Sequence, residues 1–171
     1  MAYDIYMYFK GGHKIEGSTT DEEMAKNKAS EIFSFSFGSS NPVTVGSGEL
    51  TGGKVSLSSI NVMKRYDQAS IALLEACNLS AKIDSGFIVF RRASGDAKLG
   101  ATPYLTYELV NPRIESVQWS GSAGGDDWPT ESVSIAFAAI KVNYSPSDKT
   151  GKPDLAAAGI TGWDLITNKK V

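Results

Sequence analysis

The sequence predicts a mainly β fold, a small antiparallel β-barrel or sandwich with one short α-helix. Two observations support this class. Apolar and polar residues alternate with a period of two in seven or eight segments, the pattern of half-buried strands. Only residues 67–79 carry the wider apolar spacing of a helix. The chain has 171 residues, 42% of them hydrophobic, which is enough for one core. We therefore expect a single domain, 1–171.

The first two strands are predicted near the N-terminus. Residues 3–10 alternate Tyr, Ile, Met and Phe with polar or tyrosine positions, and residues 11–28 are polar and read as a loop. Residues 33–37 alternate three phenylalanines with Ser34 and Ser36. We expect the aromatic face of this strand in the core and its hydroxyl face toward water or a partner.

Residues 38–53 are too long for a hairpin turn and show no strand pattern. Loops of this length without structure of their own are uncommon and are usually functional. Several of its residues are apolar, which is unusual for a loop that stays in solvent. We therefore expect the loop to dock on another surface, such as a neighbouring subunit. The candidate contact residues are Pro42, Val43, Val45 and Leu50.

Two longer strand patterns change phase along their length. In residues 54–65 and 130–144 the apolar residues move from one parity to the other. A β-bulge near Ser58 and Ser59, and another near residues 138–139, would explain this change. The other strands are predicted at residues 87–90, 104–110, 114–120 and 163–166.

The helix at 67–79 is predicted to begin with Ser70 as its N-cap. Leu73, Leu74 and Cys77 form its apolar stripe. The helix has about three turns, so it depends on packing against the rest of the fold.

The strand faces opposite the core carry small hydroxyl residues where solvent-facing strands usually carry Lys and Glu. The clearest pairs are Ser34 with Ser36, Ser116 with Ser120, and Ser132 with Ser134. Such faces suit contact with another subunit or the lining of a hydrated channel, and an ordinary solvated face is the alternative. Ring-forming interfaces also require two different complementary patches on each subunit.

Charge and hydropathy exclude several partners. Lys and Arg number 17 and Asp and Glu 19, a net charge of −2, which argues against binding to nucleic-acid phosphates. The apolar runs are too short to span a bilayer. The N-terminus has no Sec-type signal pattern, so we expect synthesis in the cytosol.

The reactive residues give no catalytic constellation. His13 and Cys77 are the single histidine and the single cysteine, so no internal disulfide or Cys-rich zinc site is possible. We expect His13 in a solvated loop and Cys77 as a small buried residue. Asp126 and Asp127, with Glu131 nearby, form a carboxylate cluster without matching ligands elsewhere, and a solvated loop explains them better. We predict no enzyme, no metal and no cofactor.

Several strings resemble the haemolysin-coregulated protein (Hcp) family, in the order in which that family has them. Residues 63–70 (MKRYDQAS) followed by residues 74–77 resemble its strand-to-helix segment. The other matching strings are residues 2–6, 121–126 leading into 129–133, and 162–165 with Asn168 after them. The resemblance extends over nearly the whole chain.

This resemblance implies a tube protein of the bacterial type VI secretion system. The implied fold is a small β-barrel of two sheets with one helix, similar to phage tail-tube proteins. The implied assembly is a hexameric ring that stacks into a hollow tube inside a contractile sheath, tipped by a trimeric spike protein. Small effectors would travel inside the rings. The protein would be cytoplasmic before firing and then secreted without a signal peptide or membrane insertion.

The resemblance also assigns roles to residues. Ser34 and Ser36 would face the lumen, and residues 38–53 match the extended loop that reaches adjacent subunits or the next ring. Two positions depart from the family pattern: Glu16-Gly17-Ser18 replaces the usual Gly-Glu-Ser, and Ile71 replaces a proline. The alternative function is a monomeric β-sandwich module that binds carbohydrate, with Trp119 and Trp128 as an aromatic platform.

Overall fold

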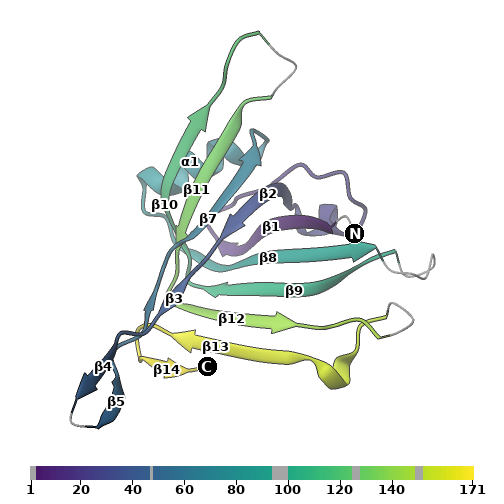
Figure 1. The fold of residues 1–171 in the computed structure, drawn as a ribbon. Helices are drawn as coiled ribbons and strands as arrows, with labels where there is room; N and C mark the ends of the chain where they lie inside the picture. Colours follow the sequence, from purple (N-terminus) through teal and green to yellow (C-terminus); the bar gives the residue numbers. More distant parts are fainter. Residues whose placement is uncertain (1–2, 47, 94–99, 125–127, 149–151) are drawn as a thin grey trace.

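A computed structural model describes residues 3–46, 48–93, 100–124, 128–148 and 152–171 (Figure 1). Most of this part of the chain is β-strand. The strands are β1 Tyr3–Gly12, β2 Ser30–Ser36, β3 Ser39–Ser40, β4 Val43–Gly46, β5 Glu49–Gly52, β6 Ser56–Leu57, β7 Ile60–Arg65, β8 Ile83–Ala93, β9 Ala101–Val110, β10 Arg113–Ser120, β11 Thr130–Ala136, β12 Ala139–Tyr144, β13 Gly159–Asp164 and β14 Lys169–Lys170. The helices are α1 Ala69–Asn78 and the short 3₁₀ helices η1 Met24–Asn27 and η2 Leu155–Ala157.

Ten strands form one sheet in the order β10-β11-β7-β2-β1-β8-β9-β12-β13-β14, and every pairing in it is antiparallel. In Figure 1, β10, β11 and β7 stand steeply, whereas β8, β9, β12 and β13 run across them. The sheet thus bends into two halves of different direction. The predicted class, mainly β and antiparallel with one α-helix, is confirmed. We call this sheet together with α1 the body.

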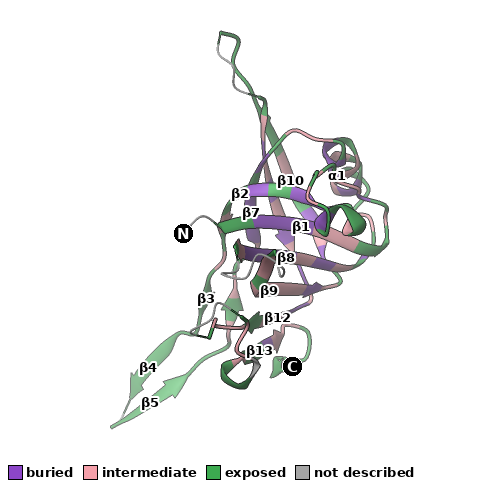
Figure 2. Ribbon diagram, turned by 90° about the vertical axis from the view of Figure 1, so that its right-hand side faces the viewer, coloured by how far each residue is buried: buried purple, intermediate pink, exposed green. Residues whose placement is uncertain are grey.

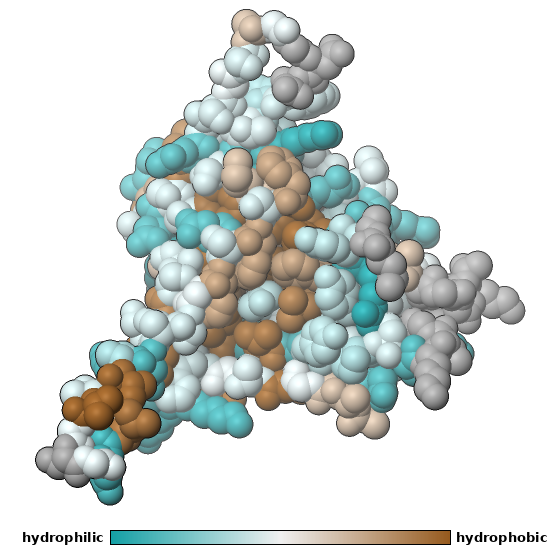
Figure 3. Space-filling model, viewed as in Figure 1, coloured by the Kyte–Doolittle hydropathy of each residue, from teal (hydrophilic) through white to brown (hydrophobic). Residues whose placement is uncertain are grey.

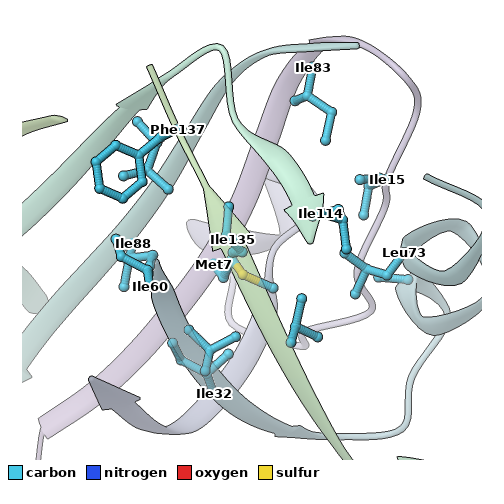
Figure 4. Packing of buried hydrophobic residues seen from close by; sticks show 14 of the residues in the cluster. Met7, Ile15, Ile32, Ile60, Leu73, Ile83, Ile88, Ile114, Ile135 and Phe137 are labelled. Carbon is cyan, nitrogen blue, oxygen red and sulfur yellow. The ribbon is translucent and has the colours of Figure 1, made fainter. Parts of the chain in front are cut away.

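Both halves of the sheet contribute apolar side chains to one core (Figure 4). The predicted alternation in the first strand is confirmed, because Ile5 and Met7 are buried in this core. The other members from the strands include Ile32, Ile60, Val62, Ile88, Leu109, Ile114, Val133, Ile135 and Ile140. The opposite face of β1 is covered as well, since Tyr6 packs with Met24 and Ala29 in a second, smaller cluster.

The helix α1 packs against β10 and buries Leu73 in the main core. Its predicted N-cap is wrong. Ser70 lies inside the first turn and is fully buried. Gln68 occupies the N-cap position without a side-chain cap hydrogen bond, and Oδ1 of the preceding Asp67 accepts a hydrogen bond of 2.9 Å from the backbone N–H of Ala69. In the described residues no helix has the length and apolar character that crossing a membrane requires.

At the two positions where the sequence predicted a β-bulge, the structure instead has a break between two strands. Ser58 and Ser59 separate β6 from β7, and residues 137–138 separate β11 from β12. Because β11 and β12 belong to different halves of the sheet, the phase change marks the corner at which the chain passes from one half to the other.

A bulge occurs instead within β2. Ile32 pairs with Lys64 and Ser34 pairs with Met63, so Phe33 is the extra residue on its strand. The prediction that Phe33 lies in the core is therefore wrong, since 53% of its surface is exposed. The bulge restores the phase for Phe35, whose ring meets that of Phe90 edge-on at 5.4 Å.

The prediction that residues 38–53 form a long loop without structure of its own is wrong. β4 and β5 pair as an antiparallel hairpin, and β3 and β6 pair below it as a short stem. Figures 1 and 2 show this segment projecting away from the body. We call β4 and β5 with their connection the hairpin.

Candidate functional site: a polar sheet face and an exposed hairpin

The serines predicted on separate strands lie on one continuous face. Two cross-strand rows result from the register of β2, β7, β11 and β10. The first row is Ser34, Met63, Ser132 and Gln118, and the second is Ser36, Asn61, Ser134 and Ser116. Residues directly opposite each other in a sheet share a face. The alternation therefore predicted this face correctly, and we call it the polar face.

The polar face points away from the core. Its neighbours along the strands, such as Val62, Val133 and Ile135, are completely buried on the other side. The two rows contain no charged residue. The Ser134 hydroxyl donates to Oδ1 of Asn61, and the two hydroxyls of Ser120 and Thr130 lie 2.9 Å apart. The two rows are thus uncharged, and the face is partly cross-linked by its own hydrogen bonds. The next row, Ser120, Thr130 and Arg65, adds one exposed cation at its end.

Asn61 and Met63 are the members of the polar face that sequence reasoning missed. Both lie on β7, where Ile60, Val62 and Lys64 are buried at the alternate positions. The period of two was present in the sequence. However, the register that places β7 between β2 and β11 depends on pairing between residues distant in the chain.

Beneath the polar face lies a buried group of charges. The Lys64 ammonium is fully buried and donates to Oδ1 of Asp67 at 2.6 Å, to Oγ of Ser70 at 3.1 Å and to the carbonyl of Arg65 at 3.0 Å. Oε2 of Glu131 lies 3.6 Å from the same ammonium, and Glu131 is also buried. Within the described residues, the Glu131 carboxylate accepts no hydrogen bond. This charge group joins β7, β11 and the start of α1.

This placement removes Glu131 from the acidic cluster considered in the sequence. Asp126 and Asp127 lie outside the described residues, and Glu131 serves as a counterion in the interior. In the described part of the chain, no group of three or more His, Cys, Asp or Glu could hold a metal ion.

The hairpin exposes its apolar side chains. The exposed fractions are 59% for Val43, 79% for Val45 and 71% for Leu50. Val45 and Leu50 are directly opposite each other, and Val43 lies two residues along on the same face. Pro42 precedes them, and its carbonyl accepts a hydrogen bond of 2.7 Å from Gly53 N–H. Figure 3 shows a hydrophobic patch on the projecting hairpin.

The segment between β1 and β2 is fastened to the sheet by Arg91. Its guanidinium is buried and donates to Oδ1 of Asp21 at 2.7 Å, to the Glu23 carboxylate and to the carbonyl of Ala101 at 2.6 Å. Burial alone would raise the pKa of Asp21, but hydrogen bonds from Met24 N–H and from Arg91 outweigh it and lower that pKa. Burial beneath this segment, with Asp21 nearby, raises the pKa of Tyr6 to about 12.

Two smaller predictions concern His13 and Cys77. His13 is not solvated, since only 20% of its side chain is exposed, and its Nε2 lies 3.9 Å from Oε2 of Glu75. Cys77 is partly buried, and its Sγ lies 3.6 Å from the carbonyl of Glu115. Cys77 lies in α1 and His13 lies near it, and among the described residues neither has the partners of a catalytic site.

The tryptophans do not form the platform that the alternative function needs. Trp119 packs edge-on against Tyr66, with ring centroids 5.1 Å apart. Trp128 is 67% exposed, and among the described residues no ring contact joins it to Trp119.

The bent antiparallel sheet, its single packed α-helix and the projecting hairpin define a mainly β protein that exposes a polar sheet face and an apolar hairpin. The chain belongs to the Hcp family: residues 6–144 match the family described as "Type VI secretion system effector, Hcp". It is 29% identical over 115 residues to Protein hcp1 of Pseudomonas aeruginosa, covering 67% of this chain and 68% of that protein.

Solved structures agree with this family. One, described as a type six secretion system protein, has 30% identity and a TM-score of 0.87, covering 99% of this chain and 100% of the other. Hcp1 from Salmonella typhimurium has 25% identity and a TM-score of 0.76, and both chains are covered completely. The chain is therefore a tube component secreted by the type VI route, which favours this function over a carbohydrate-binding module.

Proposed function

We propose that this chain forms hexameric rings that stack into a hollow tube, with the polar face toward the lumen. The observation that carries the proposal is the polar face itself, a continuous surface of hydroxyl and amide groups interrupted by Met63, on the side of the sheet away from the core. The two serine-containing rows carry no charge, so this part of the wall would neither attract nor repel a passing protein by charge. Ser34 and Ser36 belong to this wall.

The hairpin supplies the contact between subunits in this proposal. Val43, Val45 and Leu50 expose apolar surface that the chain itself does not cover. Burying apolar surface contributes roughly 25 cal/mol per Å². A ring repeats the same contact six times, so a modest gain for each hairpin accumulates over the assembly. Pro42 leads into this apolar face and is part of the same contact.

The partners follow from the tube. A contractile sheath would surround it, a trimeric spike protein would tip it, and small effectors would be carried or chaperoned within the rings. The chain would wait in the cytoplasm until firing. Its role would be structural and not catalytic.

The mass and shape of the purified chain test the proposal. Light scattering coupled to size exclusion should give the mass of six chains, and electron micrographs should show annular particles with an open centre. Ser36→Trp should keep this mass while adding density inside the ring. Ser85→Trp, on a strand of the other half of the sheet, serves as the matched control. A strict monomer would refute the proposal, and so would a Ser36→Trp ring whose added density lies outside the channel.

A further inference from the structure

We propose that residues 16–28, between β1 and β2, form a strap that Arg91 latches to the sheet, and that this strap opens when Asp21 and Glu23 lose their charge while the body stays folded. We call these three side chains the latch. The inference concerns the single chain and does not depend on the proposed tube. Opening would uncover the face of β1 that lies opposite the main core.

The strap is a compact loop whose two ends are fixed. Ile15, just before it, is buried in the main core, and Ser30, just after it, begins β2. At its base, Gly17 N–H donates a hydrogen bond of 2.7 Å to the carbonyl of Lys28, and the Lys28 ammonium donates to the Glu16 carboxylate. Compact surface loops with closed ends are frequently functional. The part between the ends is thus able to move without displacing a strand.

The attachment of the strap to the sheet is concentrated in Arg91. Among the described residues, both ion pairs between strap and sheet use this guanidinium, which donates to Oδ1 of Asp21 at 2.7 Å and to the Glu23 carboxylate. Arg91 is itself held to β9, because it donates to the carbonyl of Ala101 at 2.6 Å. Only 5% of its side chain is exposed. One buried cation on the sheet therefore holds two carboxylates on the strap.

The latch depends on the charge of these carboxylates. Burying a guanidinium without a counterion is costly, and arginine keeps its charge at every pH that a protein tolerates. When Asp21 and Glu23 become neutral, the closed strap covers an uncompensated cation. Opening returns that cation to water, so the balance shifts from the closed to the open strap.

Two further carboxylates face the latch from the neighbouring strands. Asp4 on β1 is exposed and lies directly opposite Arg91 in the register, and Glu31 on β2 accepts a hydrogen bond of 2.8 Å from the strap. Burial and Asp21 raise the pKa of Tyr6 most, and these two carboxylates raise it further, so both lie near the phenol. In the open state Asp4 still offers the guanidinium a partner.

The direction of the pH dependence follows from Asp21. Burial raises the pKa of this carboxyl, but hydrogen bonds from Met24 N–H and from Arg91 outweigh burial and lower the pKa. The stability that the pair contributes is fully present above the pKa of a free aspartate, about 3.9, and is lost as the pH falls through the lower folded value. The strap should therefore be closed at neutral pH and open in acid.

Opening would change two surfaces of the molecule. Tyr6 and Met24 pack together beneath the strap, and each is 5% exposed in the closed chain. Residues 18–20 of the strap also line a groove of about 1490 Å³ next to the polar face. An open strap would expose the first surface and remove part of one wall of the groove, while the ten-stranded sheet keeps its pairing.

Hydrogen exchange followed by mass spectrometry at pH 7 tests the latch in the full chain. Asp21→Asn/Glu23→Gln removes both charges, and the asparagine oxygen still accepts from Met24 N–H as Oδ1 does in the parent. We expect peptides from residues 16–28 to exchange about tenfold faster than in the parent, whereas peptides from β7 and β11 keep their rates. The matched control is Glu22→Gln, which removes a neighbouring exposed charge outside the latch and should exchange like the parent.

Adding Arg91→Met to the double variant separates the charge mechanism from simple damage to the strap. The triple variant has no unpaired cation, so the exchange of residues 16–28 should return toward the parent rate. In the parent, the protection factors of these residues should fall below about pH 4 before those of the body. The triple variant should show no such separate step.

Each of these measurements has an outcome that overturns the inference. Unchanged exchange of the strap in Asp21→Asn/Glu23→Gln would show that the latch does not hold it. Equal acceleration in β7 and β11 would show that the strap opens only when the whole chain unfolds. Still faster exchange after Arg91→Met would refute the uncompensated cation as the cause of opening.

Discussion

The body and the hairpin are built from the same antiparallel pairing, yet they are stabilised differently. Ile60 and Ile135 of the body are completely buried in a core shared by both halves of the sheet. In the hairpin no described residue is buried, and Val45 is 79% exposed. An isolated two-stranded hairpin is only marginally stable in water. The hairpin therefore contributes a surface to the molecule and little to its folding.

The two regions also reverse the usual distribution of residue types. The body buries Lys64 and Glu131 and presents serines on its outer face, whereas the hairpin presents Val45 and Leu50 to solvent. A buried ion pair adds little net stability but is costly to break, and an exposed apolar patch commonly marks a contact surface. The difference separates residues that hold the fold from residues that are available to a partner.

Removing the buried cation should produce the largest change in stability. In Lys64→Met, the buried Glu131 carboxylate loses its counterion, and Asp67 and Ser70 lose their donor. Breaking a buried pair in this way costs about 3–5 kcal/mol. We expect a decrease of that size in the free energy of unfolding, measured by urea denaturation.

A double variant provides the control for this change. Lys64→Met/Glu131→Leu removes both charges and should recover a large part of the lost stability, because no unpaired charge stays in the core. Ser132→Ala on the polar face, next to Glu131 in the sequence, should change the unfolding free energy by less than about 0.5 kcal/mol. If the single variant is as stable as the parent, the charge group does not hold β7, β11 and α1 together.

A smaller loss of stability is expected at alkaline pH. It comes from Tyr6, which lies on the face of β1 opposite the main core. Burial raises the pKa of Tyr6 from 10.0 to about 12. Below pH 10 the phenol is protonated in both the folded and unfolded chains, and its contribution to stability is fully present. As the pH rises from 10 through 12, the unfolded chain releases the proton first, so this contribution is lost. Melting temperatures between pH 8 and pH 11.5 measure the loss.

Tyr6→Phe should flatten this alkaline decline, although Tyr8, Tyr104 and Tyr107 have raised pKa values and keep part of it. Tyr3→Phe, at an exposed position of the same strand, is the control and should follow the parent. If the melting temperature of Tyr6→Phe falls with pH as steeply as that of the parent, the Tyr6 phenol is not buried by the segment between β1 and β2.

The sequence was sufficient for the features that depend on local periodicity. The alternation placed Ile5 and Met7 in the core, located α1, and assigned Ser34 and Ser36 to a face away from the apolar interior. These features follow from the period of two in strands and the wider spacing in helices.

Features that depend on distant pairing could not be predicted in this way. The bulge that exposes Phe33 is defined by its register against β7. The burial of Lys64 involves Glu131, which lies 67 positions further along the chain. A break between two strands and a β-bulge both shift the apolar residues from odd to even positions. In the sequence, the break between β11 and β12 therefore looks like a bulge. Only the order of strands in the sheet distinguishes the two.

The hairpin was missed for a local reason. Its glycines weaken a strand pattern, and Gly48 has a φ of +91°, a conformation that favours glycine. Val43, Thr44 and Val45 are residues typical of strands, and they were the signal for β4. What the sequence did indicate was that the apolar residues of this segment dock on another surface. They are exposed in the single chain, and the docking itself stays a prediction.

The smallest change in stability should come from removing the hairpin. Replacing residues 42–53 with a short Gly/Ser turn leaves every pairing of the ten-stranded sheet in place. We expect the free energy of unfolding to stay within about 0.5 kcal/mol of the parent, as for surface changes away from the core. Stacking of rings should weaken, because the apolar face of the hairpin is gone. Val45→Ser/Leu50→Ser, which keeps the backbone pairing, should weaken stacking to a similar degree in micrographs, whereas Thr44→Ser/Thr51→Ser on the other face of the hairpin should not. Unchanged stacking in the shortened chain, or a large loss of stability, would show that the hairpin belongs to the fold and not to the contact between subunits.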